Sequence, residues 1–215
     1  MAVPDPIRLP SLHSAQSTGI VTVAGGVALT AAVLIDVTAV LVLSERWDDP
    51  TTWQYSLRAA SLLVGWSLLF VASVVAARER YAHGRLWRVG NTWTALGFGV
   101  VTAGFAVVVF GPPLGGTTAS DLGTTVARTG MAVGVAPGSV VYGLAWAREA
   151  AVARSTGTPL SLAGALLALT ATGFVGPLVL RGVVTPAVER GLFLAFPLGW
   201  LVFGSVRWAS VRGTP

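Results

Sequence analysis

The chain has 215 residues, of which 53% are hydrophobic and only 11% are charged. Soluble domains usually carry about 25% charged residues, so this composition excludes an ordinary soluble domain. The net charge of +5 comes from arginines spread over the ends of apolar segments, which argues against a nucleic-acid partner because such partners need a clustered basic face.

Six apolar segments follow one another along the chain, and a helix of about 20 apolar residues crosses a bilayer. Residues 1–18 contain three prolines and are expected to form a flexible N-terminal tail. The connectors are too short to bury a core, so the sequence predicts an all-α membrane protein with one six-helix domain at 19–208 and a C-terminal tail at 209–215. The predicted spans are 19–43, 57–77, 91–112, 127–147, 160–180 and 191–206.

The arginines predict the orientation of the bundle. Cytoplasmic loops of membrane proteins favour basic residues. With both termini inside, nine arginines lie on the cytoplasmic side and five on the opposite side, and the connector 78–90 holds four of the nine. We therefore expect a multi-pass protein of the cell membrane with both termini in the cytoplasm.

Small residues recur at four-residue spacing in the predicted spans. Gly130, Gly134 and Gly138 share one face of the fourth span, and Gly164 and Gly176 belong to a similar stripe in the fifth. A small face lets two helices approach closely in lipid. The stripe in the fourth span therefore packs either against another helix of the same chain or against a second copy.

Prolines interrupt the last three spans at positions 137, 177 and 197. Each proline removes a backbone donor and frees the carbonyl four residues earlier, which for Pro137 is that of Val133. Kinks are expected at these positions. They either shape the bundle or form interrupted helices that line a cavity, as in many carriers.

Asp36 is the one acidic residue well inside an apolar segment. A charged carboxylate at this depth costs about 2.5–3.5 kcal/mol on insertion scales, so it should face protein rather than lipid. Three interpretations are open. Asp36 forms an ion pair with Arg58 or Arg128, it is protonated and hydrogen-bonded, or it is a coupling site for a proton or cation.

The tryptophans divide into two groups. Six of the eight lie near predicted span ends, where they are expected to form an interfacial belt. Trp66 and Trp200 lie in mid-span, where each indole N–H needs a partner.

The predicted spans contain no histidine and the chain no cysteine, so a metal site, a haem site and a cysteine nucleophile are not expected. We therefore expect no cofactor and no enzymatic activity. The favoured interpretation is a packing or assembly subunit of a membrane complex, in contact with lipid and with a membrane-protein partner or a second copy. The alternative is a carrier of a small solute or ion, or the binding subunit of one, with Asp36 in a midplane cavity.

Overall fold

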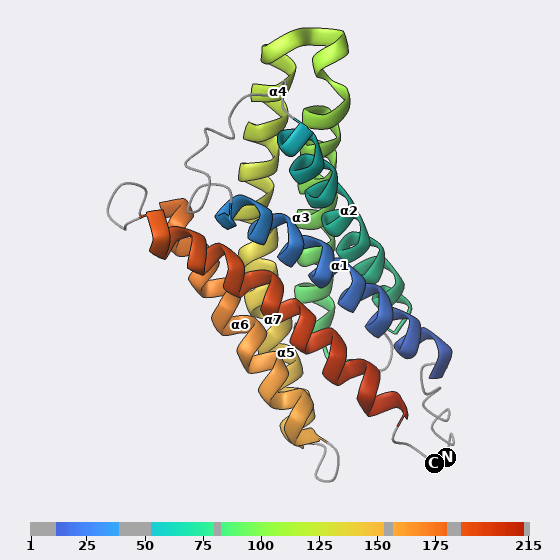
Figure 1. The fold of residues 1–215 in the computed structure, drawn as a ribbon. Coiled ribbons are helices and arrows are strands. Elements are labelled where there is room, and N and C mark those ends of the chain that lie inside the picture. Colours follow the sequence, from blue (N-terminus) through green and yellow to red (C-terminus); the bar gives the residue numbers. More distant parts are fainter. Residues whose placement is uncertain (1–11, 39–52, 80–82, 153–156, 180–185, 213–215) are drawn as a thin grey trace.

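The computed structural model describes residues 12–38, 53–79, 83–152, 157–179 and 186–212, and these residues are helical apart from short links. Figure 1 shows their arrangement. The elements in chain order are α1 (Leu12–Thr38), α2 (Trp53–Ala76), the 3-10 turn η2 (Ala77–Glu79), α3 (Arg85–Phe110), α4 (Pro112–Thr129), the π-helical turn η3 (Gly130–Val135), α5 (Ala136–Val152), α6 (Gly157–Val179) and α7 (Pro186–Arg212).

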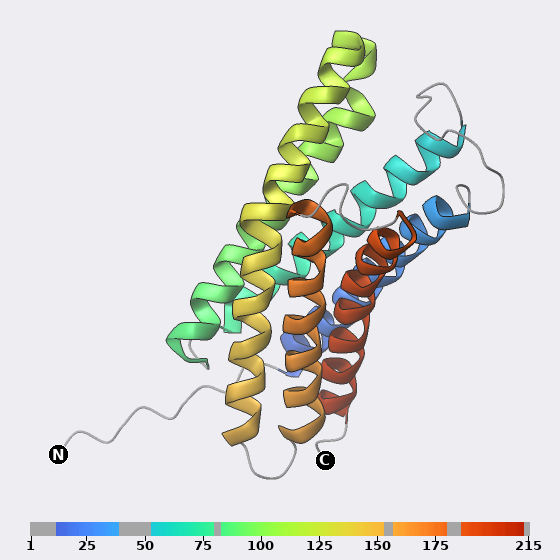
Figure 2. The same ribbon diagram turned by 90° about the vertical axis from the view of Figure 1, so that its left-hand side faces the viewer.

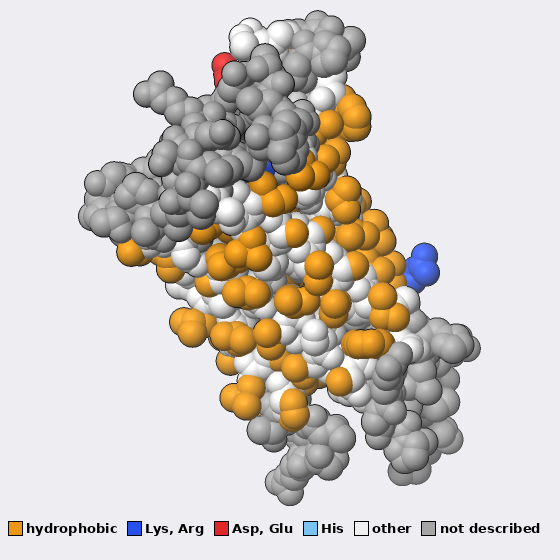
Figure 3. All heavy atoms as spheres, viewed as in Figure 1, with side chains coloured by type: hydrophobic (Ala, Val, Ile, Leu, Met, Phe, Trp, Pro, Cys, Tyr) orange, Lys and Arg blue, Asp and Glu red, His pale blue; other side chains and the backbone are white. Residues whose placement is uncertain are grey.

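Most of these helices are suited to a bilayer. By length and composition, α1, α2, α3, α7 and the continuous rod from α4 to α5 can each cross a membrane, while α6 is a shorter apolar helix in its described part. Many large hydrophobic side chains, such as Leu96, Leu162 and Leu169, are exposed on the outer surface. Figure 3 shows hydrophobic side chains spread over the middle of one face of the molecule. The chain is therefore a multi-pass α-helical membrane protein.

The helices form a closed ring. Each packs against its neighbours in the order α1, α2, α3, α5, α6 and α7, and α7 returns to pack along α1. Figure 2 shows α5, α6 and α7 running side by side, with the end of α5, the start of α6 and the end of α7 at the lower end. Helices on opposite sides of the ring contact each other mainly through side chains, so these side chains determine what lies at its centre.

Aromatic side chains fill that centre. Phe174 stacks on Phe196 with ring centroids 4.5 Å apart, and Phe196 lies 6.0 Å from Trp66. The series continues through Phe98 to Trp200 and reaches Tyr142, whose ring stacks on Trp200 at 5.9 Å. This aromatic column, which consists of Phe174, Phe196, Trp66, Phe98, Trp200 and Tyr142, joins α2, α3, α5, α6 and α7.

The segment between the third and fourth predicted spans is a helix, which corrects the prediction of a loop at 113–126. α4 occupies these residues and continues through η3 into α5. Close backbone packing along α3 explains the helix, because a Cβ on Gly123 would lie 2.7 Å from Gly104 O and 2.8 Å from Val108 N. Gly116 has φ +60° and ψ −146°, a conformation that favours glycine, and it interrupts α4 near its start.

The first and last helices extend beyond their predicted limits. α1 begins at Leu12, inside the predicted tail, and α7 covers Pro186–Arg212 rather than 191–206. Mutual packing accounts for the extra turns, since a Cβ added at Gly19 of α1 would lie 3.0 Å from the Cβ of Trp208 in α7. Residues 1–11 of the predicted tail and 213–215 lie outside the described residues.

A π-helical turn marks the position of Pro137. In η3, the N–H of Ala136 donates to the carbonyl of Met131, five residues earlier. The carbonyl of Val133, expected to be freed by Pro137, accepts a hydrogen bond from Trp93 Nε1 of α3 at 3.0 Å. The proline therefore changes the local helix geometry and ties α3 to the α4–α5 rod.

Candidate functional site

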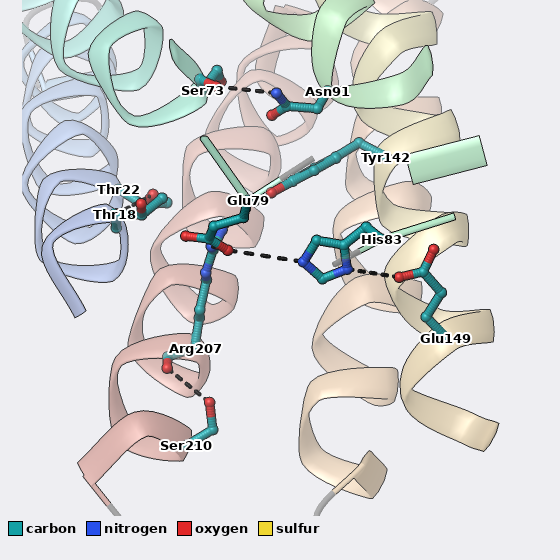
Figure 4. Close-up of polar contacts among 10 residues, drawn as sticks. All are labelled: Thr18, Thr22, Ser73, Glu79, His83, Asn91, Tyr142, Glu149, Arg207 and Ser210. Carbon is teal, nitrogen blue, oxygen red and sulfur yellow. Dashed lines mark hydrogen bonds and ion pairs between the residues drawn. The ribbon is translucent and has the colours of Figure 1, made fainter. Parts of the chain in front are cut away.

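Five polar side chains converge at the lower end of the ring, as Figure 4 shows. Glu79 ends η2, His83 precedes α3, Tyr142 and Glu149 come from α5, and Arg207 comes from the last turns of α7. We call these residues the polar cluster. They join three parts of the chain that are far apart in sequence, namely the segment from η2 to the start of α3, α5 and the end of α7.

The centre of the polar cluster is an ion pair. Arg207 Nη2 lies 2.5 Å from Glu79 Oε2, and the two side chains are 3% and 2% exposed. Arg207 Nη1 also donates to Tyr142 Oη at 3.2 Å, and the guanidinium carbon lies 5.2 Å from the centre of the Trp146 ring. Removing two charges from water costs several kcal/mol for each ion, so this pair depends on its geometry.

One oxygen of the Glu79 carboxylate forms no hydrogen bond with a described residue. Glu79 Oε1 is buried, and it has no hydrogen-bond partner among the described residues. Buried polar atoms in native proteins are nearly always hydrogen-bonded, so an unpartnered carboxylate oxygen calls for a physical explanation. A proton or a water molecule is the simplest group that would satisfy it.

His83 lies between two carboxylates. Its Nδ1 is 2.8 Å from Glu149 Oε2, and its Nε2 is 3.8 Å from Glu79 Oε2. The N–H of Gly84 donates to the other oxygen of Glu149 at 2.9 Å, which holds that carboxylate toward the ring. The imidazole also stacks on Trp87, with centroids 4.4 Å apart.

Local structure decides which charged side chains enter the cluster. At the end of α2, Glu79 is buried while its neighbour Arg78 is exposed, and in α5 Glu149 is partly buried while Arg148 is exposed. Arg85 and Arg88 in the first turns of α3 are also exposed, and we call these four exposed arginines, which lie close in sequence to residues of the cluster, the basic rim. A hydrogen bond from Asn91 Nδ2 to the carbonyl of Ser73, 3.1 Å long, holds α2 against α3 at this end.

Asp36 lies near the opposite end of the ring. Arg58 Nη1 is 3.3 Å from Asp36 Oδ1, with side chains 33% and 24% exposed, so the structure brings these two residues together. Arg128 is exposed and forms no ion pair with any other described residue. Asp36 is therefore a partly exposed partner of Arg58 and takes no part in the aromatic column.

Asp36→Asn should consequently have a small effect. We expect the free energy of unfolding to fall by about 1 kcal/mol or less, because partly exposed ion pairs contribute little. Chemical unfolding of the purified protein in detergent, followed by circular dichroism, would measure it. A loss as large as that of a buried pair would show that Asp36 has a more central role.

The glycine stripe of the fourth predicted span faces α3 of the same chain. A Cβ on Gly130 would lie 2.9 Å from Val100 Cγ1, one on Gly134 would lie 2.5 Å from Gly97 Cα, and one on Gly138 would meet Thr94. Gly164 packs against Gly143 of α5 in the same way, while the surroundings of Gly176 lie outside the described residues. Because α3 covers the stripe, it is not available to a second copy.

Two tryptophans of the predicted interfacial belt are instead part of the interior. Trp87 and Trp146 are buried and pack around His83. Both residues lie near helix ends in the sequence. At this end of the ring, however, the faces of α3 and α5 that carry them point toward the interior. Trp66 and Trp200 lie in the centre, and within the described part of the chain their indole N–H groups have no hydrogen-bond partner.

Sequence reasoning missed the whole polar cluster. A usable signal was present, because Glu79, Glu149 and Arg207 stand one or two residues after the predicted ends of the second, fourth and sixth spans. These ends lie on the same side of an up-and-down bundle, so opposite charges there can meet. His83 and Tyr142 carry no comparable signal.

Among the described residues, no group of three or more histidine, aspartate and glutamate side chains could hold a metal ion. Searches of protein-family models, curated proteins and solved structures each gave no match to this chain.

Proposed function

We propose that the protein is an ion-coupled membrane carrier of a small solute, and that the polar cluster closes one mouth of its helix ring. The observation that supports this proposal is the buried Glu79–Arg207 ion pair at the end of the ring. The proposal includes no chemical transformation of the solute. It assigns the coupling role to Glu79 rather than to Asp36, for which a coupling site was one of three interpretations open from the sequence.

Stability alone does not explain a buried ion pair at this position. Well-packed hydrophobic side chains often hold a protein together as firmly as a buried ion pair, or more firmly. Ionisable groups inside membrane helices are expensive, and they commonly mark the routes of ions and substrates. A cluster that ties η2 and the start of α3 to α5 and α7 is well placed to close the ring, and to open it when its charges change.

The centre of the ring contains buried polar groups. The hydroxyl groups of Thr94 and Ser139 are buried there without a hydrogen-bond partner among the described residues, as are the indole N–H groups of Trp66 and Trp200. Water or a polar solute would satisfy these donors in an open state. The structure described above then corresponds to a closed state of the carrier.

The orientation follows the basic rim. Arg78, Arg85, Arg88 and Arg148 are exposed and lie close in sequence to the polar cluster, and basic residues favour the cytoplasmic side. We therefore place the cluster at the cytoplasmic mouth, with both termini inside and the protein in the cell membrane.

Cysteine labelling tests whether the centre opens, because the chain has no native cysteine. Ser139 is buried one turn from Tyr142 on the inward face of α5. We expect Ser139→Cys to react with a membrane-impermeant thiol reagent in liposomes, and to react several times faster when Glu79→Gln is added. The side from which the reagent acts reports the orientation.

Two control positions complete this test. Leu169→Cys lies on the exposed apolar face of α6 and should stay unreactive to a reagent confined to water. Arg148→Cys lies on the rim and should react in all variants. Absence of labelling at position 139 in both backgrounds, with normal labelling at position 148, would contradict a carrier.

The second candidate is a non-enzymatic assembly subunit. The filled aromatic column favours it, because a permanently packed centre leaves only the outer surface for function. Such a protein would keep Ser139→Cys unreactive under all conditions, and it would co-purify with a partner in stoichiometric amount.

A further inference from the structure

We propose that Glu79 is a proton-binding site and that Glu149 and His83 form the path by which protons reach it. The inference goes beyond the proposed function, because it holds whether or not the ring carries a solute. It rests on the order of the three side chains, on their increasing burial and on the unpartnered oxygen of Glu79.

The three groups lie in a graded series from the surface to the interior. The side chain of Glu149 is 30% exposed, that of His83 is 13% exposed and that of Glu79 is 2% exposed. The first step, from Glu149 Oε2 to His83 Nδ1, spans 2.8 Å, which is a hydrogen-bond distance. The second, from His83 Nε2 to Glu79 Oε2, spans 3.8 Å and needs a small movement of the ring or one intervening water.

The transfer is balanced with one proton. A hydronium ion at the rim protonates Glu149 Oε2, which donates this proton across the 2.8 Å contact to the unprotonated Nδ1 of a neutral imidazole whose own proton is on Nε2. His83 Nε2 then gives its own proton to the carboxylate of Glu79, which becomes a neutral carboxylic acid. A return of the imidazole to its first tautomer restores the path. The net change is the loss of one proton from solution and the gain of one positive charge by the cluster.

The surroundings determine what this proton does. The titratable and charged groups near Glu79 among the described residues are His83, Tyr142 of α5 and Arg207 of α7 (Figure 4), while on α1 the hydroxyl of Thr22 donates to the carbonyl of Thr18. A neutral Glu79 leaves the guanidinium of Arg207 without its counter-ion. Proton binding therefore weakens the tie between η2 and α7, and with it the closure of this end of the ring.

The arrangement of Glu149, His83 and Glu79 favours proton transfer among them over a purely structural role. Gly84 fixes one oxygen of Glu149, so the other is directed at His83. Trp87 and Trp146 hold the imidazole plane from two sides, which keeps both nitrogens aligned with the carboxylates. On Glu79, Oε2 faces both His83 Nε2 and Arg207, so a proton that arrives there competes directly with the contact to Arg207, while Oε1 has no partner among the described residues.

Infrared difference spectroscopy of the full chain in liposomes tests the proposal. On a rapid decrease in pH, the wild type should develop the carbonyl band of a protonated carboxylic acid in an apolar environment. Glu79→Gln should lack this band. Asp36→Asn, which removes the carboxylate at the other end of the ring, should retain it and serves as the matched control.

The path is tested by the rate at which the band develops. His83→Gln keeps a polar side chain but cannot pass a proton between two nitrogens, so the band should develop about 100-fold more slowly, at the low end of what a positioned proton-transfer group contributes. Glu149→Gln should slow it as well, while both variants should reach the final amplitude of the wild type.

Two results would overturn the proposal. A carboxylic acid band that persists in Glu79→Gln would place the proton elsewhere, and an unchanged rate in both His83→Gln and Glu149→Gln would exclude the path. Circular dichroism and gel filtration at each pH establish that the variants are folded. Labelling of Ser139→Cys remains a separate measurement, so failure of the carrier proposal and failure of the proton site can be distinguished.

Discussion

Arg207→Met should lower the free energy of unfolding by about 3–5 kcal/mol, because it leaves Glu79 as an unpaired charge in the interior of the ring. The guanidinium holds Glu79, the hydroxyl of Tyr142 and the face of Trp146 at the same time. Reversible unfolding in a mixed detergent, followed by circular dichroism and tryptophan fluorescence, would give the value.

The double variant Glu79→Met and Arg207→Met removes both charges of the buried ion pair. It therefore separates the effect of losing the pair from the effect of leaving one buried charge without a partner. If the single change is costly because it leaves an unpaired buried charge, removing both charges should recover most of the lost stability. The double variant should nevertheless lose the acid-induced infrared band. A double variant as unstable as Arg207→Met would instead show that the arginine acts mainly through its packing on Tyr142 and Trp146.

Gly134→Leu should prevent α3 from approaching the α4–α5 rod. A Cβ at position 134 would lie 2.5 Å from the Cα of Gly97, and backbone atoms cannot move aside as a side chain can. We expect a loss of about 3 kcal/mol or more, at or above the upper end of ordinary overpacking, and a low yield of monodisperse protein. Fluorescence-detected gel filtration after heating would measure the loss.

Gly191→Leu is the matched control for this prediction. It introduces the same side chain into a helix, but a Cβ at Gly191 meets no atom within 4 Å. The control should therefore be close to the wild type in yield and heat stability. Equal losses in the two variants would mean that the added leucine side chain itself, rather than close packing at position 134, explains the effect of Gly134→Leu, because helix propensity favours leucine over glycine.

The sequence by itself determined the membrane class, the presence of long apolar helices and the faces on which several of them pack. These features depend on local properties, namely the length of an apolar run and the spacing of small residues along a helix. The freed carbonyl of Val133 is a similar case, since a missing N–H at Pro137 affects only the preceding turn. An ion pair was one of three interpretations of Asp36 open from the sequence, because a carboxylate in an apolar span needs a partner, and the structure places Arg58 beside it.

Only the tertiary structure decided which charges meet. Arg78 and Glu79 are neighbours in the sequence, as are Arg148 and Glu149, and in each pair the carboxylate turns toward the ring while the arginine turns away. That choice follows from the rotation of η2 and α5 about their axes, which is set by packing against other helices. Adjacent residues are about 100° apart on an α-helix and about 120° apart on a 3-10 helix. The same rotation buries Trp87 and Trp146 and places His83 between two carboxylates. The polar cluster is thus a property of the closed ring, because no single segment contains both its charges and the walls that exclude water from them.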